Sequence, residues 1–167
     1  MMKKLFIIMA MLFIISSVDA KIFKRALIEI GPKASLYINE ENEDVQFGIG
    51  VEVVVNPLRS VGFRFNLTEI RFDPTTFYFN REGSIDAFVY IPMQNMQLYV
   101  LAGIGLKTHE TGAGTQTHYS IQGGLGLNYP LNQRTTLFAE PAVIISGNGE
   151  TDVSFRVSVG GRFGVID

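Results

Sequence analysis

The feature that most constrains this chain is an alternation with a period of two residues, seen most clearly in the stretch VQFGIGVEVVV, Val45 to Val55. Successive side chains of a β-strand point to opposite faces of the sheet. One face of this stretch would carry only valine, isoleucine and phenylalanine, and the other mainly glutamine, glycine and glutamate. The alternation recurs in eight segments, without a comparable helical period between them. The pattern therefore predicts an all-β protein.

Clusters of turn-forming residues separate the segments. Proline, glycine, asparagine and aspartate dominate residues 39–44, 56–59, 73–76, 92–95, 109–116, 130–133 and 147–150. Seven short connections predict eight antiparallel strands in an up-and-down order. In the third segment the alternation slips by one residue near Thr68 and Glu69, which predicts a β-bulge.

The faces opposite the apolar ones combine charged residues with glycines. Their charged positions include Arg25, Glu29, Lys33, Glu52, Arg64, Asp86, Lys107, Glu140, Arg156 and Arg162. Glycine on a water-facing strand surface only weakens the strand, whereas inside a narrow barrel it leaves room for long side chains. An eight-stranded barrel also has little interior space for the bulky apolar faces. We therefore predict a transmembrane β-barrel with apolar side chains outward and a plug of salt bridges in the lumen.

This topology assigns each connection to one side of a membrane. Connections 56–59, 92–95 and 130–133 would be periplasmic turns, and the other four would be outer loops. Aromatic residues are expected near both membrane interfaces. We place Tyr37, Phe72, Phe77, Tyr78 and Tyr119 near the outer interface, and Tyr129 and Phe163 near the inner one.

The first twenty residues have the layout of a secretory signal peptide. Lys3 and Lys4 precede an apolar run from Leu5 to Val18, and Ala20 provides a small residue before the cleavage point. We expect residues 1–20 to be removed and residues 21–167 to form the barrel domain. The chain has no cysteine, and its net charge of −2 without a basic run argues against a nucleic-acid partner.

Two parts of the sequence resemble a known group of membrane proteins. The stretches LYVLAGIGL and YSIQGGLGLNYPLNQRTTLFAEP are similar to strands five to seven of small eight-stranded outer-membrane β-barrels of the OmpA-like and OmpX/Ail-like superfamily. In SVGGRFGV, the residues Ser158, Gly160, Phe163 and Val165 resemble the C-terminal signal read by the barrel-assembly machinery. The resemblance implies an outer membrane of the Gram-negative type, with lipopolysaccharide and other membrane lipids as neighbours. Its members include structural proteins, adhesins, complement-evasion proteins and lipid A-modifying enzymes.

One short motif raises the possibility of catalysis. His118 and Ser120 resemble the His-x-Ser pair of the outer-membrane lipid A 3-O-deacylase, and Glu140 could orient the histidine. We predict no triad, because all three side chains share the lumen face whereas a lipid ester approaches from the bilayer. The turn at 130–133 also sets Glu140 opposite about residue 123, about 10 Å from Ser120 along the strand.

No metal or cofactor site is expected. His109 and His118 lack companion ligands, and the acidic loop NEENED at 39–44 is more typical of a solvated hairpin than of a Ca²⁺ site. The leading hypothesis is a non-enzymatic outer-membrane barrel that contributes to envelope structure and surface interaction, with an unknown surface ligand. The alternatives are a lipid A-modifying enzyme and a soluble periplasmic barrel that binds an apolar ligand.

Overall fold

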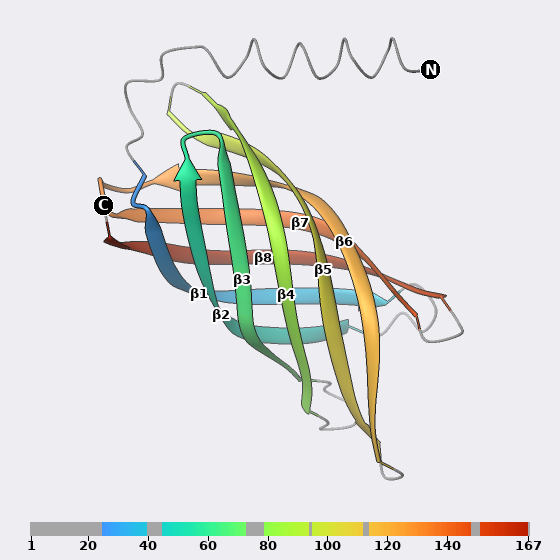
Figure 1. The fold of residues 1–167 in the computed structure, drawn as a ribbon. Helices are drawn as coiled ribbons and strands as arrows, with labels where there is room; N and C mark the ends of the chain where they lie inside the picture. The colour runs from blue at the N-terminus through green and yellow to red at the C-terminus, as the bar shows by residue number, and fades with distance from the viewer. Residues whose placement is uncertain are drawn as a thin grey trace, which may run out of the picture.

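The computed structural model describes residues 25–39, 45–72, 79–93, 95–111, 114–147 and 151–166. The strands are β1 Ile28–Asn39, β2 Val45–Leu58, β3 Val61–Phe72, β4 Phe79–Pro92, β5 Gln97–Thr111, β6 Gly114–Pro130, β7 Thr135–Gly147 and β8 Thr151–Ile166. Each pairs antiparallel with the next, and β1 also pairs with β8, so the sheet closes into a barrel (Figure 1). The predicted eight-stranded up-and-down barrel is confirmed. None of the described residues belongs to a helix long and apolar enough to cross a membrane.

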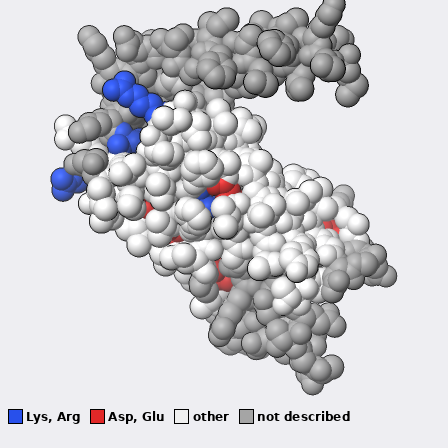
Figure 2. Space-filling view, viewed as in Figure 1, with Lys and Arg blue, Asp and Glu red and all other residues white. Residues whose placement is uncertain are grey.

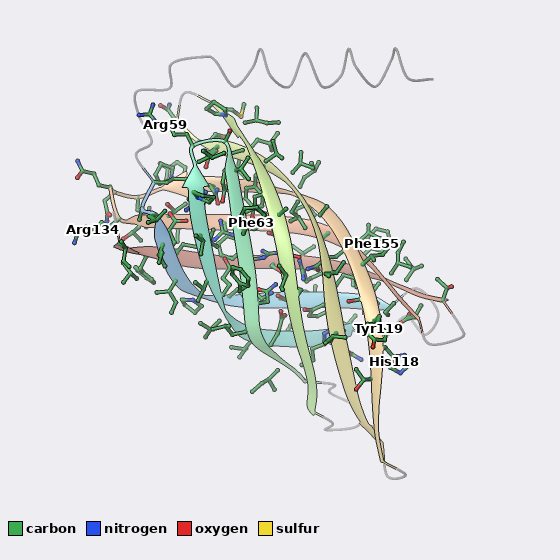
Figure 3. The ribbon with its side chains drawn as sticks, viewed as in Figure 1. Arg59, Phe63, His118, Tyr119, Arg134 and Phe155 are labelled. Carbon is green, nitrogen blue, oxygen red and sulfur yellow. The ribbon has the colours of Figure 1, made fainter. Side chains whose placement is uncertain are left out.

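The two ends of the barrel can be told apart by the termini. Ile28 pairs with Ile166 at the same end as the Arg59–Ser60 turn and the turn containing Arg134. We call this the terminal end and the opposite one the distal end. Figure 3 shows Arg59 and Arg134 at the terminal end, with His118 and Tyr119 toward the distal end.

Side-chain exposure shows which face of the sheet is inside. Ile104 is 64% exposed and Val51 is 44% exposed, whereas Glu52, Arg64 and Glu140 are fully buried. The outer surface in view is largely uncharged (Figure 2). The predicted facing, with apolar side chains outward and charged side chains inward, is confirmed for these positions.

The predicted β-bulge is present in β3. The register of β3 with β2 shifts between Val51 and Glu52, and its register with β4 shifts between Asn66 and Glu69. Two residues of β3, Leu67 and Thr68, therefore lie opposite one residue of β4. The extra residue returns Glu69 to the lumen, where it is buried.

Several details of the sequence interpretation were wrong. Strands β5 and β6 extend into the predicted 109–116 loop, to Thr111 and from Gly114, and these two residues still pair. The 56–59 turn begins later, because β2 runs to Leu58. Tyr37 faces the lumen and is 2% exposed, since it shares the parity of Lys33 rather than that of the outward residues.

Other predictions concern residues that the structure does not describe. Residues 1–20, the loops at 40–44 and 73–76, Phe77 and Tyr78 lie outside the described residues, as does the side chain of Phe72. Tyr119, Tyr129 and Phe163 are exposed on the outer surface, which agrees with their predicted facing.

The lumen also contains an apolar layer that the alternation did not predict. Val54, Phe88, Tyr90, Tyr99 and Leu101 form one buried cluster. The rings of Phe88 and Tyr90 meet edge to face, with centroids 5.8 Å apart. These residues occupy inward-facing positions of their strands. The period of two identified the inward face, but it did not show that part of this face is apolar.

Candidate functional site

The centre of the lumen is organised around Arg64 on β3. Its Nε donates to Asp86 Oδ2 at 2.6 Å, and its two terminal nitrogens donate to Glu140 Oε2 at 2.7 Å and Oε1 at 3.0 Å. Nη1 also lies 3.4 Å from Glu52 Oε2. All four side chains are fully buried, and they come from β2, β3, β4 and β7. One guanidinium thus connects strands from opposite sides of the barrel.

Two further arginines on β8 extend this network. Arg162 Nε donates to Glu52 Oε1 at 2.5 Å, and Arg162 Nη1 donates to Asn128 Oδ1 at 2.9 Å. Arg156 Nη2 donates to Glu140 Oε1 at 2.7 Å, and Arg156 Nη1 donates to Gln122 Oε1 at 2.8 Å.

Shared acceptors turn these contacts into one connected structure. Gln122 Nε2 in turn donates to Asp86 Oδ1. Glu140 receives hydrogen bonds from Arg64, Arg156 and the hydroxyl of Tyr99. Glu140 is therefore the shared acceptor for two of the three central arginines, Arg64 and Arg156.

A second ionic group lies nearer the distal end. Lys33 Nζ lies 2.5 Å from Glu69 Oε2, and the Tyr37 hydroxyl donates to Glu69 Oε1 at 2.5 Å. The guanidinium of Arg71 lies 3.4 Å from the centre of the Tyr37 ring, in cation–π geometry. Glu69 and Arg71 were not predicted as lumen charges, although the slip in alternation at the bulge places both on the polar face and could have identified them.

A third polar group closes the terminal end. Asn56 Nδ2 donates to the backbone oxygen of Ala26 at 3.0 Å and to Glu29 Oε2 at 3.2 Å. Asn56 Oδ1 accepts from Arg25 Nη1 at 3.2 Å and from the Tyr90 hydroxyl at 2.9 Å. Asn56 was interpreted only as a turn residue. It lies inside because β2 continues beyond it, and no feature of its local sequence distinguishes the two roles.

Glycines allow this density of side chains. A Cβ atom at Gly103 would collide with Asp86, and one at Gly126 would collide with the ring of Tyr99. Both glycines lie on the inward parity of their strands, as the sequence pattern suggested. Their role here is to yield space to a neighbouring strand's charged or aromatic side chain.

The predicted residues can now be placed. The described lumen positions are Arg25, Glu29, Lys33, Glu52, Arg64, Asp86, Glu140, Arg156 and Arg162, each with at least one contact given above. The side chain of Lys107 lies outside the described part of the structure, and its backbone pairs with Glu82 and His118.

The predicted assembly signal lies on β8. Ser158 is buried and its hydroxyl lies 2.9 Å from that of Ser35, while Phe163 and Val165 are exposed on the outer surface. A Cβ at Gly160 would approach the ring of Phe138 to 2.6 Å, so this glycine has a packing role of its own. Recognition by the assembly machinery stays a prediction.

The candidate triad is not assembled. Ser120 pairs with Ser146, whereas the neighbour of Glu140, Ala139, pairs with Leu127. The predicted pairing of Glu140 with about residue 123 was therefore wrong, and the true register separates it further from Ser120. Ser146 and Glu140 are six positions apart along β7, which is about 20 Å of strand. Triad members need successive hydrogen bonds of about 2.6–3.2 Å, so these residues cannot act together.

Within the described ranges, no group of three or more histidine, cysteine, aspartate or glutamate side chains is placed to hold a metal ion. The carboxylates of the lumen are instead engaged by arginine, lysine, tyrosine and amide donors. The site is thus a set of interlocked ion pairs and hydrogen bonds.

No protein-family model and no curated protein sequence matches the chain. Solved structures do match it. Neisserial surface protein A superposes with a TM-score of 0.66 at 14% identity, covering 83% of this chain and 96% of that protein. The N-terminal β-barrel domain of Pseudomonas aeruginosa OprF superposes with a TM-score of 0.59 at 16% identity, covering 81% and 97% respectively.

The chain has the fold of the small eight-stranded outer-membrane β-barrels. The attachment invasion locus protein Ail of Yersinia pestis is a further match, with a TM-score of 0.48 at 16% identity over 81% of this chain and 96% of that one. At these identities the similarity concerns the fold. The arrangement of lumen ion pairs described above comes from this chain's own residues.

Proposed function

We propose that this chain is an outer-membrane protein whose barrel spans the membrane and whose lumen is plugged by ion pairs. The observation that carries the proposal is the inversion of the usual soluble pattern. Large aliphatic side chains such as Ile49, Ile104 and Val159 are more than half exposed, while Arg64, Arg156 and Arg162 are buried. Lipid is the solvent in which such an outer surface is stable.

The topology follows from the strand number. Eight strands place both ends of the barrel domain on one side, which would be the periplasm. The terminal end would then face the periplasm and the distal end the exterior. The protein would contribute to envelope structure and surface interaction without catalysis, and the matched Neisserial protein is itself called a surface protein.

The alternatives are less well supported. A soluble barrel that binds an apolar ligand needs an apolar lumen, whereas the centre of this one is occupied by the Arg64, Arg156 and Arg162 network. A lipid A deacylase resembling the His-x-Ser enzyme would need His118, Ser120 and Glu140 in contact, and the register separates them.

The location can be tested with the full-length chain expressed in a Gram-negative host. We expect it in the outer-membrane fraction, shortened by its signal peptide, and migrating faster on gels before boiling than after, because a closed barrel resists detergent unfolding. A matched sample unfolded in urea before loading is the control. Recovery in the soluble periplasmic fraction without a heat-dependent shift would refute the proposal.

The plugged lumen predicts little conductance. Each central cation contacts at least one carboxylate or amide oxygen, and the lumen of an eight-stranded barrel is narrow. We expect planar bilayers containing the purified protein to show no large, steady channel, with a general porin measured in parallel as the positive control. A reproducible open channel of porin size would contradict the plugged lumen.

A further inference from the structure

Two prolines lie inside strands of this barrel, Pro32 in β1 and Pro141 in β7. Proline has no backbone N–H group, and within sheets it is normally confined to edge strands, strand ends and bulges. A closed barrel has no edge strand. Each of these prolines therefore interrupts a ladder of backbone hydrogen bonds, and the strand pairing shows where.

The first interruption lies between β1 and β8. The two strands pair on both sides of Gly31 and Pro32, but these two residues have no partner among the described residues of β8. Pairing with β2 is continuous through Pro32, which lies opposite Val51, so the lost hydrogen bond is on the β8 side. The acceptor without its ladder donor is the backbone oxygen of Gly161. This oxygen lies so close to Gly31 that a Cβ atom there would collide with it.

The second interruption lies between β6 and β7. These strands pair on both sides of Glu140 and Pro141, but neither residue has a partner among the described residues of β6. Pro141 still pairs with Val157 of β8, so the lost hydrogen bond is on the β6 side, where the register places the backbone oxygen of Leu125. A Cβ atom at Gly124 would lie 2.5 Å from the Pro141 oxygen, so a glycine again allows the strands to approach closely.

Both interruptions border the same hairpin. Strands β7 and β8 lie between β6 and β1, and they pair with each other without a gap from Thr135 to Gly147 of β7 (Figure 1). By comparison, β5 pairs continuously with both of its neighbours. The β7–β8 hairpin is thus a continuous unit that is joined to the rest of the barrel by two interrupted ladders.

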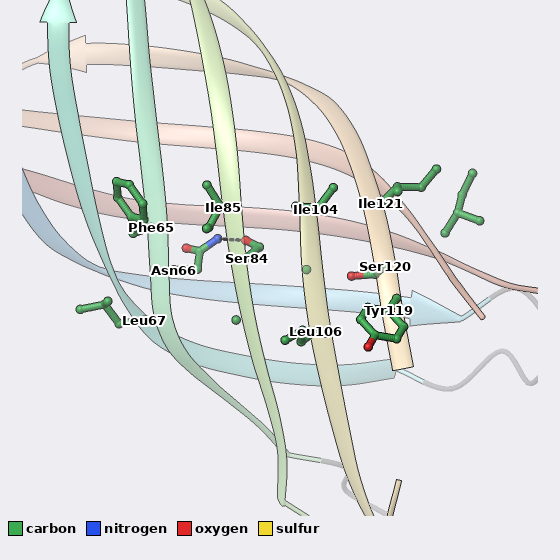
Figure 4. Close-up of a pocket in the computed structure, with 13 residues that line it drawn as sticks. Phe65, Asn66, Leu67, Ser84, Ile85, Ile104, Leu106, Tyr119, Ser120 and Ile121 are labelled. Carbon is green, nitrogen blue, oxygen red and sulfur yellow. Dashed lines mark hydrogen bonds between the residues drawn. The ribbon is translucent and has the colours of Figure 1, made fainter. Parts of the chain in front are cut away.

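The outer surface beside the β6–β7 ladder is apolar. On the distal side of Pro141, Ile121 and Ile145 lie opposite each other in the wall of a hollow that extends to β3 (Figure 4). None of the described residues that line this hollow is charged. Aliphatic side chains in lipid gain little by contacting one another instead of lipid chains, so this surface does not fasten the hairpin.

Lumen side chains attach the hairpin instead. Glu140 of β7 accepts hydrogen bonds from Arg64 of β3 and Tyr99 of β5. Arg162 of β8 donates to Glu52 of β2. Each of these contacts crosses the lumen to a strand that is not a ladder neighbour of the hairpin. The ion pairs therefore hold the hairpin at the places where the backbone ladders do not.

We propose that the β7–β8 hairpin is a latched segment, which separates from β1 and β6 as one unit and opens the barrel sideways. The latch is the set of lumen contacts made by Glu140 and Arg162. Opening breaks the two interrupted ladders and leaves the ladder between β7 and β8 intact. Under the proposed function the opening faces lipid, but the separation itself does not depend on that location.

The two sides of β8 allow a direct test. By the register, the amides of Val157 and Val159 bond to β1. Those of Arg156 and Ser158 bond to β7 and stay protected when the hairpin opens. The measurement is hydrogen–deuterium exchange of the refolded full chain in phospholipid bicelles, followed by NMR and corrected for intrinsic rates. We expect exchange to be roughly tenfold faster at Val157 and Val159, whereas neighbouring amides of β5 should exchange at similar rates.

Replacing Pro32 with valine supplies the missing N–H group between β1 and β8. Exchange at Val157 and Val159 should then slow roughly tenfold, the effect of about one hydrogen bond. Pro92→Val is the matched control, because it makes the same substitution at the end of β4. It should leave exchange in β8 unchanged.

The latch is tested with Glu140→Gln, which should speed exchange at the same two amides because it weakens the contacts from Arg64 and Tyr99. Glu69→Gln is its control, since this buried carboxylate contacts Lys33 of β1 and not the hairpin. The heat-dependent gel shift reports folding of each variant. If Glu140→Gln does not fold, Gln122→Leu, which removes one contact of Arg156, takes its place.

Equal protection on the two sides of β8 in the wild type would overturn the proposal. So would a slowing by Pro92→Val as large as that by Pro32→Val, or equal acceleration by Glu69→Gln and the latch variant. Recovery of the protein outside the outer membrane would refute the proposed function and leave these exchange results as the test of the hairpin.

Discussion

Replacing Glu140 with glutamine should lower the free energy of unfolding by about 3–5 kcal/mol, the range for removing one partner of a buried ion pair. Glu140 is fully buried and accepts hydrogen bonds from Arg64, Arg156 and Tyr99. Glutamine keeps the shape of the side chain but leaves two guanidinium groups without their shared anion. Urea titration of the barrel in lipid vesicles, followed by the gel shift, measures the change.

The control for this substitution is Arg59→Gln, which removes a charge from the exposed Arg59–Ser60 turn. Exposed positions of this kind usually change stability by no more than about 0.5 kcal/mol. The double variant Glu140→Gln with Arg156→Met should cost less than the sum of the two single changes, because the second removes a cation that the first has left unpaired. A Glu140→Gln barrel as stable as the wild type would show that the lumen does not depend on this network.

Replacing Val51 with arginine should cost roughly 2–4 kcal/mol in lipid vesicles, the range for a cation on the lipid face at the bilayer midplane. Val51 lies near the middle of β2 and is 44% exposed on the outer surface. Val51→Leu, which keeps the position apolar, is the matched control. The same urea titration measures the loss.

Gly48→Arg distinguishes this lipid effect from simple crowding. Gly48 faces the lumen on the same strand, and a Cβ there would collide with the Glu69 carboxylate. Gly48→Arg should destabilise the barrel in detergent micelles and in bilayers alike, whereas Val51→Arg should be much worse in bilayers. If Val51→Arg were neutral in bilayers, the outward assignment of that face would be wrong.

Much of the fold could be predicted because the relevant information is local. The alternation in β2 identifies its two faces, and turn residues mark most strand ends. The slip near Thr68 located a bulge that the pairing of β3 with β2 and β4 confirms. Where this reasoning was wrong, as at 109–116, polar turn-like residues continue a paired hairpin instead, and their backbone groups are satisfied by the neighbouring strand.

The candidate site was only partly accessible in this way. Parity placed Arg64 and Glu140 on one face, but the two are 76 residues apart and meet because the sheet closes across the lumen. Parity places Tyr37 inside with Lys33, against its assignment to the outer interface, but only the tertiary structure shows that its hydroxyl donates to Glu69. Asn56 has the local sequence of a turn. It faces the lumen, where its side chain makes several hydrogen bonds, only because β2 continues to pair beyond it.

The sequence by itself determined which residues face inward, because that depends only on the period of two along each strand. Tertiary structure decided which inward residues meet, because closure of the barrel and the stagger between strands set the height of each one in the lumen.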